Sequence, residues 1–245
     1  MCDICGQSSH LVSPVSSRRH FLKLAAGAAA GLAISGKAFA AGDAAPKPQN
    51  VLSPDEALKR LKAGNLRYIN GTMKRHDFET ERETLAGGQN PYAGILSCAD
   101  SRIGPEFAFD TARGDLFVVR VAGNFANEDG VASFEYAVKF LGMPLLVVLG
   151  HDKCGAVDAT IKAVKDGAEM PGHIPYLVDR IKPAVTQAMK ESGDLLENSI
   201  RDNVLLNVAK LKASSPILDE AVNAGKIRVV GGIYKLKTGG IDWLL

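Results

Sequence analysis

The sequence predicts an α/β fold: a mainly parallel four-stranded sheet flanked by helices, with a C-terminal antiparallel edge strand. Aliphatic runs at residues 92–96, 116–121, 144–150 and 226–234 are typical of buried strands. The segments between them carry apolar residues at helical spacing, which is the pattern of parallel strands joined by crossover helices. The part of the chain that contains these runs has about 200 residues, enough for one core.

The first 40 residues have the order of parts found in an export signal. Arg18 and Arg19 precede a mild apolar run at residues 24–34, and a small-x-small cleavage site ends at Ala40. This order predicts a twin-arginine (Tat) signal peptide at residues 1–40. The apolar run is too short for a transmembrane helix, which needs about 20 residues. We therefore expect export by the Tat machinery, no stable membrane insertion, and a periplasmic or otherwise extracytoplasmic product.

The charge of the remaining chain is close to zero. Without residues 1–40, 25 Lys and Arg stand against 26 Asp and Glu. A near-neutral surface gives no electrostatic reason to expect nucleic acid or an anionic membrane as a partner. Cys2 and Cys5 lie in the segment to be removed, and we leave this Cys-x-x-Cys pair unassigned. The two cysteines that remain, Cys98 and Cys154, are candidates for metal ligands.

The domain itself is expected at residues 52–245, after a short polar linker at residues 41–51. Its first helix begins at Ser53-Pro54-Asp55-Glu56, where the serine caps the helix, the proline takes the first helical position and the glutamate completes a capping box. Residues 72–88 are charged and irregular, and they lead to Gln89.

Further elements are expected between and after the later strands, from helical spacing and from glycine and proline stop signals. They are, in order, a helix at residues 131–141 ended by Gly142, a helix at residues 156–165, a helical region at residues 170–214 interrupted by prolines, a helix from Ser215 to Gly225, and the edge strand at residues 241–245.

Thiol and imidazole side chains follow two of the predicted strands. Cys98 comes directly after the first strand, and His151 and Cys154 follow the third. Because the carboxyl ends of parallel strands meet at one edge of a sheet, we expect these side chains to converge there. Zn(II) prefers this donor set, and three protein ligands leave a fourth position for water, which is typical of catalytic zinc. The plainer alternative is that both cysteines are small buried apolar residues.

The loop after the first strand also carries a charged pair, Asp100 and Arg102. Charges placed against the end of an apolar strand are costly unless they pair with each other. We therefore expect an ion pair between these two side chains, which favours a functional loop over an ordinary turn.

Two short runs resemble the signature pair of a known family. The runs Cys98-Ala99-Asp100-Ser101-Arg102 and Gly150-His151-Asp152-Lys153-Cys154-Gly155-Ala156 are similar to those of the β-class carbonic anhydrases, zinc enzymes that interconvert carbon dioxide and bicarbonate. The resemblance extends from about Leu52 to the C-terminus. Ala99 and Ala122 depart from the family's common serine and bulkier valine, and neither is a ligand position.

The resemblance implies a function and a set of site residues. It implies one Zn(II) per chain, bound by Cys98, His151 and Cys154, and reversible hydration of carbon dioxide to bicarbonate and a proton by attack of zinc-bound hydroxide. It also implies that Asp100 orients the hydroxide and that Arg102 keeps Asp100 ionised. The residues that it assigns to the substrate are Gln89, Phe117, Tyr136 and Gly155. The family further implies a homodimer or higher homo-oligomer with the active site at the subunit interface.

Two other functions remain open from the sequence. A related enzyme on the same scaffold would hydrolyse carbonyl sulfide or carbon disulfide, because pocket shape decides which small electrophile enters. A non-catalytic zinc or thiol module would use Cys98 and Cys154 for metal binding or redox chemistry. The presence of Asp100, Arg102 and Gln89 argues against the second alternative.

Overall fold

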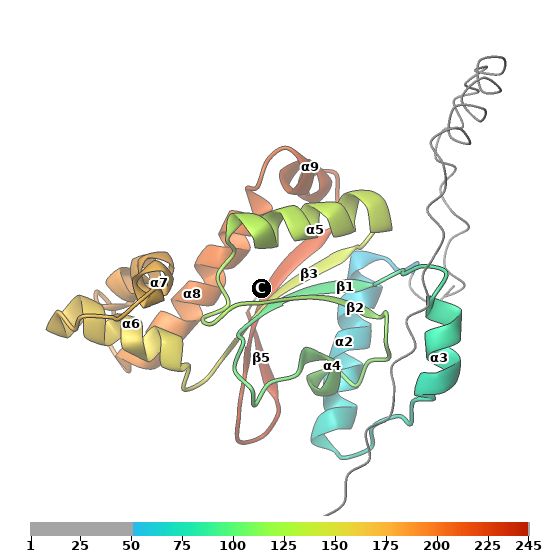
Figure 1. The fold of residues 1–245 in the computed structure, drawn as a ribbon, viewed down its shortest axis with the longest axis horizontal. Helices are drawn as coiled ribbons and strands as arrows, with labels where there is room; N and C mark the ends of the chain where they lie inside the picture. The colour runs from blue at the N-terminus through green and yellow to red at the C-terminus, as the bar shows by residue number, and fades with distance from the viewer. Residues whose placement is uncertain (1–50, 245) are drawn as a thin grey trace, which may run out of the picture. The chain divides into compact units, whose positions relative to one another are not determined.

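The computed structural model describes residues 51–244, so the expected signal at residues 1–40 and nearly all of the expected linker lie outside the described residues. The described residues form a five-stranded sheet in the order β2-β1-β3-β4-β5 (Figure 1). The strands are β1 (Ala93–Ser97), β2 (Leu116–Arg120), β3 (Leu145–His151), β4 (Arg228–Tyr234) and β5 (Ile241–Leu244). β1 to β4 are parallel to one another, and β5 is antiparallel to β4. The predicted fold class is confirmed.

The central strands β1 and β3 are buried along their whole length, as their aliphatic sequences predict. They pair directly with each other, so that Ser97 lies opposite Leu149 on one side and opposite Arg120 of β2 on the other. β1, β2 and β3 therefore end at the same edge of the sheet. This edge is where the loop containing Cys98 and the loop containing Cys154 emerge.

One face of the sheet is covered by α2 (Pro54–Ile69) and α4 (Pro105–Ala108). The predicted capping box of α2 is present, because Ser53 Oγ accepts from the Glu56 amide and the Glu56 carboxylate accepts from the Ser53 amide. Leu58 and Leu61 of α2 are buried in the cluster of apolar side chains between the two helices and the sheet. Burial of this face fixes α2 on the sheet.

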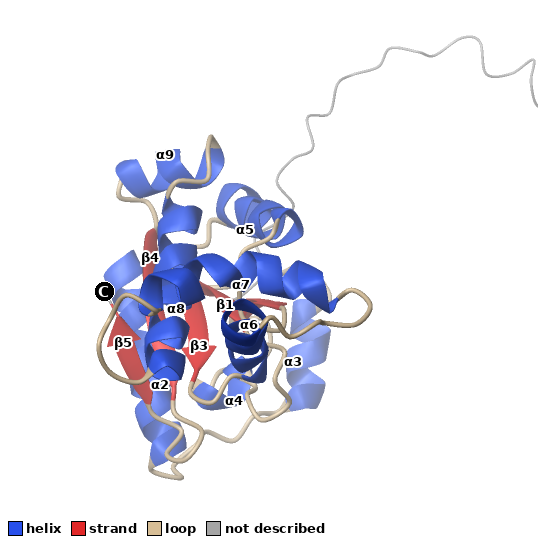
Figure 2. Cartoon of the chain, turned by 90° about the vertical axis from the view of Figure 1, so that its left-hand side faces the viewer, coloured by secondary structure: helices blue, strands red, loops and turns tan. Residues whose placement is uncertain are grey.

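The opposite face is covered by α5 (Glu128–Leu141), α8 (Leu195–Lys212) and α9 (Ile217–Asn223) (Figures 1 and 2). α5 begins at Asn127, whose side chain accepts from the Gly130 amide, and ends where Gly142 adopts a left-handed φ of 65°. The expected helix at residues 131–141 is confirmed, with one further turn at its start. Phe134 and Ala137 of α5 are fully buried against this face.

Two further helices, α6 (Gly155–Asp166) and α7 (Ile174–Ala188), lie beside α8 (Figure 1). Together with α8 they enclose a third apolar cluster, which includes Val157, Ile181 and Ile200. Cys98 and Cys154 are members of this cluster, so the expected metal ligands have a dry, packed surrounding. Among residues 51–244, no helix is long and apolar enough to cross a membrane.

Three details of the predicted elements are wrong. Residues 72–88 are not irregular throughout, because Asp77 caps a helix, α3 (Phe78–Leu85), by accepting from the amides of residues 79 and 80. Pro183 does not interrupt a helix but lies inside α7, where burial of its neighbours against the core keeps the helix intact. Ser215 makes no capping hydrogen bond, and α9 starts two residues later.

Candidate metal centre

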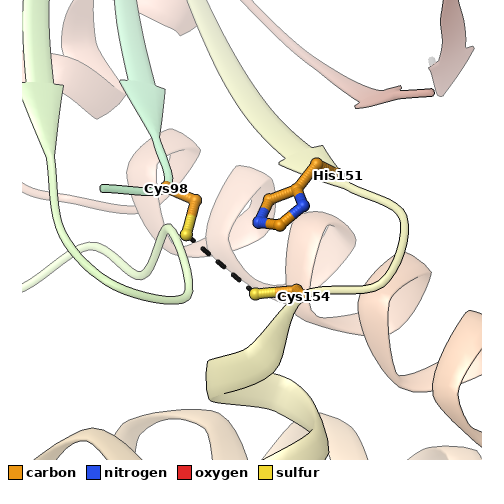
Figure 3. A group of neighbouring side chains, drawn as sticks. All are labelled: Cys98, His151 and Cys154. Carbon is orange, nitrogen blue, oxygen red and sulfur yellow. Dashed lines mark hydrogen bonds between the residues drawn. The ribbon is translucent and has the colours of Figure 1, made fainter. Parts of the chain in front are cut away.

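Three buried side chains converge at the carboxyl edge of the sheet: Cys98, His151 and Cys154 (Figure 3). Cys98 follows β1, His151 is the last residue of β3, and Cys154 immediately precedes α6. One potential ligand atom of each residue lies within 4.8 Å of the others, and the two sulfur atoms are 4.0 Å apart. The predicted convergence is confirmed, and the donor set fits a tetrahedral Zn(II) with one position left for a small ligand.

The orientation of His151 also fits a metal. Its Nδ1 lies 2.8 Å from the carbonyl oxygen of Asp152. Because a carbonyl can only accept, Nδ1 carries the proton, and the lone pair is on Nε2. This Nε2 is buried and makes no hydrogen bond among the described residues. A buried nitrogen lone pair without a donor is costly in a folded protein, and a metal ion at this position removes that cost.

In the metal-free protein, the pKa values of Cys98, Cys154 and His151 are shifted in different directions. The pKa of Cys98 is lowered to about 4, first because the Cys154 thiol donates to its sulfur and further because the Gly123 amide does so too. The pKa of Cys154 is raised, since it must lose its proton beside the Cys98 sulfur and in a buried place. Burial alone would lower the pKa of His151, but the neighbouring Cys98 thiolate raises it above its usual value. Zinc binds thiolates and neutral imidazole, so it replaces these protons.

The predicted pairing of Asp100 and Arg102 is present. Arg102 Nε and Nη2 donate to the two carboxylate oxygens at 2.9 and 2.7 Å, and the Arg102 amide donates to Oδ1 at 2.9 Å. The Arg102 guanidinium therefore holds the pKa of Asp100 well below its usual range. Asp100 Oδ2 is 3.9 Å from His151 Nε2, so an ionised carboxylate faces the position of the metal.

Arg120, at the end of β2, is a supporting residue that sequence reasoning missed. Its Nε donates to the Cys98 carbonyl at 3.0 Å and its Nη2 to the Asp100 carbonyl at 2.7 Å. Arg120 therefore fixes the backbone that carries both a ligand and the expected orienting carboxylate. The sequence feature that could have indicated this role is an arginine at the end of the strand that pairs with β1.

Within one chain, three of the four expected substrate residues lie away from the metal group. Gln89 is exposed and precedes β1, whereas Cys98 follows this strand, so the length of β1, about 16 Å, separates them. Phe117 is on β2, opposite Gly94 of β1, and lies about 10 Å along the strand from the carboxyl end of β2. Tyr136 is on the outer surface of α5 and is 49% exposed. Gly155 alone, as the first residue of α6, directly adjoins a ligand.

Known proteins share both the sequence and the fold of this chain. The family model described as carbonic anhydrase matches residues 93–241. Carbonic anhydrase 2 of Mycobacterium tuberculosis is 39% identical over 188 residues, which cover 76% of this chain and 91% of that protein. A carbonic anhydrase of Mycolicibacterium smegmatis is 36% identical over 191 residues, covering 78% of this chain and 93% of the relative.

Solved structures agree with these relatives. The β-carbonic anhydrase CcaA superposes with a TM-score of 0.60 at 26% identity, covering 77% of this chain and 92% of that one. A structure described as one of two tetrameric β-carbonic anhydrases from Sordaria macrospora gives a TM-score of 0.58 at 26% identity, covering 78% of this chain and 94% of the other. With its Cys-His-Cys group at the carboxyl edge of a mainly parallel sheet, the chain belongs to the β-class carbonic anhydrase family.

Proposed function

We propose that this chain catalyses the reversible hydration of carbon dioxide to bicarbonate and a proton, with one zinc ion per chain bound by Cys98, His151 and Cys154. The observation that carries the proposal is the buried Cys-His-Cys group with an ionised carboxylate, Asp100, 3.9 Å from His151 Nε2. When bound, zinc lowers the pKa of a coordinated water from about 16 to about 7, which supplies a nucleophile near neutral pH.

Asp100 orients the nucleophile. An ionised carboxylate can only accept hydrogen bonds, so the proton of the nucleophile points toward Asp100 and its lone pair is free to face carbon dioxide. Arg102 keeps Asp100 in the ionised form, and its two parallel hydrogen bonds fix the plane of the carboxylate. Arg120 keeps the loop in place through the carbonyls of residues 98 and 100.

A second copy of the chain supplies the remaining substrate contacts. Gln89 precedes β1, Phe117 lies three residues before the end of β2, and Tyr136 is exposed on α5, so none of them lies beside the metal group of its own chain. Among the described residues, β2 pairs on one side only, and its residues are half-buried or exposed. Tyr136 stacks beside Phe140, which is 72% exposed, on the adjacent α5. An unpaired strand beside exposed aromatics is typical of a surface that is covered in an oligomer, so we propose a homodimer or higher homo-oligomer.

The apolar side chains and the amide groups have separate tasks in this shared site. Phe117 and Tyr136 offer an apolar wall for carbon dioxide, Gln89 donates to a bicarbonate oxygen, and Gly155 brings the start of α6 close to the substrate. The Cys98 sulfur and burial raise the pKa of Cys154 in the metal-free protein, and the amides of Val157 and Ala156 at the start of α6 act in the opposite direction, so they favour the thiolate form that zinc binds.

Residues 1–40 direct the chain to the Tat export machinery and are removed near Ala40, which gives a periplasmic or otherwise extracytoplasmic enzyme. The support for this part of the proposal is the order of the twin arginines, the apolar run and the small-x-small site. A fusion of residues 1–45 to a folded reporter, with an Arg18→Lys/Arg19→Lys control, tests it. Export of both fusions to the same extent would contradict it.

Elemental analysis and stopped-flow hydration of carbon dioxide test the catalytic proposal together. We expect one zinc per chain and an activity that rises as the pH increases through neutrality. Zinc without hydration of carbon dioxide would refute the proposed reaction, and parallel assays with carbonyl sulfide and carbon disulfide would then identify the electrophile.

A further inference from the structure

We propose that Asn203 and Asn207 of α8 are positioning residues for the metal centre, acting through the loop after β2 on the ligand Cys98. The inference rests on the proposed binding of zinc by Cys98, His151 and Cys154. Both asparagines are buried, and their side-chain hydrogen bonds go to the loop after β2 and to each other rather than to the metal group.

The loop after β2 reaches the metal group at one atom. The Gly123 amide donates a hydrogen bond to Cys98 Sγ at 3.3 Å. A hydrogen bond to a thiolate withdraws charge from the sulfur, so it weakens the donation of the sulfur to a metal and makes the metal a stronger Lewis acid. It also fixes the rotamer of the cysteine before the metal arrives. The position of the Gly123 amide is therefore a property of the metal centre.

The backbone of this loop has an uncommon conformation, which its two residues Gly123 and Asn124 permit. Gly123 has a φ of +86° and Asn124 a φ of +42°, so two successive residues adopt left-handed conformations. A Cβ on Gly123 would lie 2.4 Å from Ile181 Cδ1, so a larger residue would fit here only if the buried Ile181 side chain moved. Such a loop keeps one geometry only where surrounding groups hold it.

α8 provides that support along one face. Asn203 Nδ2 donates to the Gly123 carbonyl at 2.7 Å. Asn207 Oδ1 accepts from the Ala126 amide at 2.8 Å, and its Nδ2 donates to the Asn203 carbonyl at 2.7 Å. Lys210 Nζ then donates to the Ala126 carbonyl at 2.6 Å. Residues 203, 207 and 210 are successive positions on one helical face, and together they hold the loop at both ends.

The chemistry of this face favours positioning over simple packing. On a neighbouring stripe of α8, Val204, Val208 and Leu211 pack against the sheet, and apolar residues are sufficient there. Buried amides are costly unless every polar group is satisfied, and here the loop after β2 supplies the partners. The hydrogen bond of Asn203 to Gly123 fixes the residue whose own amide donates to Cys98 Sγ.

Cobalt substitution measures this effect directly. In the Asn203→Ala protein loaded with Co(II), we expect the thiolate-to-cobalt charge-transfer band to move to lower energy, because a sulfur that loses its hydrogen-bond donor gives up an electron more easily. We also expect zinc to transfer to a chelator about tenfold faster, because the loss of a fixed Cys98 rotamer outweighs the stronger donation by a sulfur without its hydrogen bond. The turnover number should fall with little change in KM.

Asn198→Ala is the matched control. Asn198 is a buried asparagine of the same helix, and its Nδ2 donates to the Ser192 carbonyl rather than to the loop. We expect it to lower thermal stability without moving the band or the rate of zinc loss. If Asn203→Ala does not fold, Asn207→Asp keeps an acceptor for the Ala126 amide and loses the donor to Asn203, so it should give smaller shifts in the same direction.

An unchanged band and an unchanged rate of zinc loss in the folded position-203 or position-207 variant would overturn the inference. This result is distinct from failure of the proposed function. Wild-type protein that binds no zinc or cobalt would refute the proposed function, whereas active wild-type protein with spectrally silent variants would refute the role of α8 alone.

Discussion

The carboxylate of Asp100 faces the lone pair of His151 across the metal position, at 3.9 Å between Oδ2 and Nε2. The Arg102 guanidinium donates one hydrogen bond to each carboxylate oxygen. The carboxylate therefore remains ionised and cannot rotate away without breaking these two hydrogen bonds. Asp100 can therefore accept a hydrogen bond from a small molecule bound at the fourth position of the metal. It is not itself one of the three metal ligands, which are Cys98, His151 and Cys154.

Asp100→Asn tests that role. An amide of the same shape presents a donor as well as an acceptor, so the nucleophile is no longer held with its lone pair toward carbon dioxide. We expect kcat/KM for hydration to fall about a hundredfold or more while zinc content stays at one per chain. Asp158→Asn, which changes a half-buried carboxylate paired with Lys162, is the control and should leave both quantities unchanged. Wild-type turnover in the Asp100 variant would remove the proposed role.

Zinc binding should release protons and weaken as the pH falls. In the metal-free protein the pKa values of Cys154 and His151 are raised, so at neutral pH Cys154 carries a proton that zinc must displace. As the pH decreases through the raised pKa of His151, a second proton must also leave, and the apparent affinity falls more steeply. Calorimetry in buffers with different ionisation enthalpies measures the number of protons released, and a value near zero at pH 7 would contradict this charge distribution.

The metal-free protein should be sensitive to oxidation. The two sulfur atoms are 4.0 Å apart, and the thiolate form of Cys98 is favoured, which is the form that attacks an oxidant. In a Cys2→Ser/Cys5→Ser background, a mild disulfide reagent should convert both remaining thiols to one disulfide, with the reagent taking up the two electrons. Zinc-loaded protein should keep both thiols. Equal thiol loss with and without zinc would show that these sulfurs are not the ligands.

Gly123→Ala and Gly142→Ala form a matched pair at left-handed positions. Both force alanine into a positive φ, but the added Cβ at Gly142 meets open space, whereas at Gly123 it approaches Ile181 at 2.4 Å. We expect the Gly123 variant to lose about 1–3 kcal/mol more unfolding free energy than the Gly142 variant. Denaturant titration of both proteins measures the difference, and equal losses would mean that Ile181 moves aside without cost.

The sequence was sufficient to predict the sheet and the metal ligands because both depend on local pattern. Aliphatic runs indicate buried strands, and parallel strands end at one edge of a sheet, so convergence of Cys98, His151 and Cys154 was expected, and the family resemblance then identified them as zinc ligands. The support for these ligands was not predictable in this way. Asn203 lies 80 residues from the Gly123 carbonyl to which it donates, and a polar residue on a helix normally indicates a solvated face. α3 was missed because its start depends on the single cap Asp77 within a charged segment.

Mixed oligomers test whether the site is shared between chains. Cys154→Ser chains lack a metal ligand, and Gln89→Ala chains lack the expected substrate amide, so each homo-oligomer should be nearly inactive. In a mixed dimer, the metal group of the Gln89→Ala chain meets an intact Gln89 from its partner, and one of the two sites is complete. Random mixing should therefore restore about a quarter of wild-type activity. Mixing Cys154→Ser with Cys98→Ser chains should restore none, because both defects affect the same group. If the first mixture is also inactive although mixed dimers form, Gln89 acts within its own chain, and the proposed division of the site between two copies is wrong.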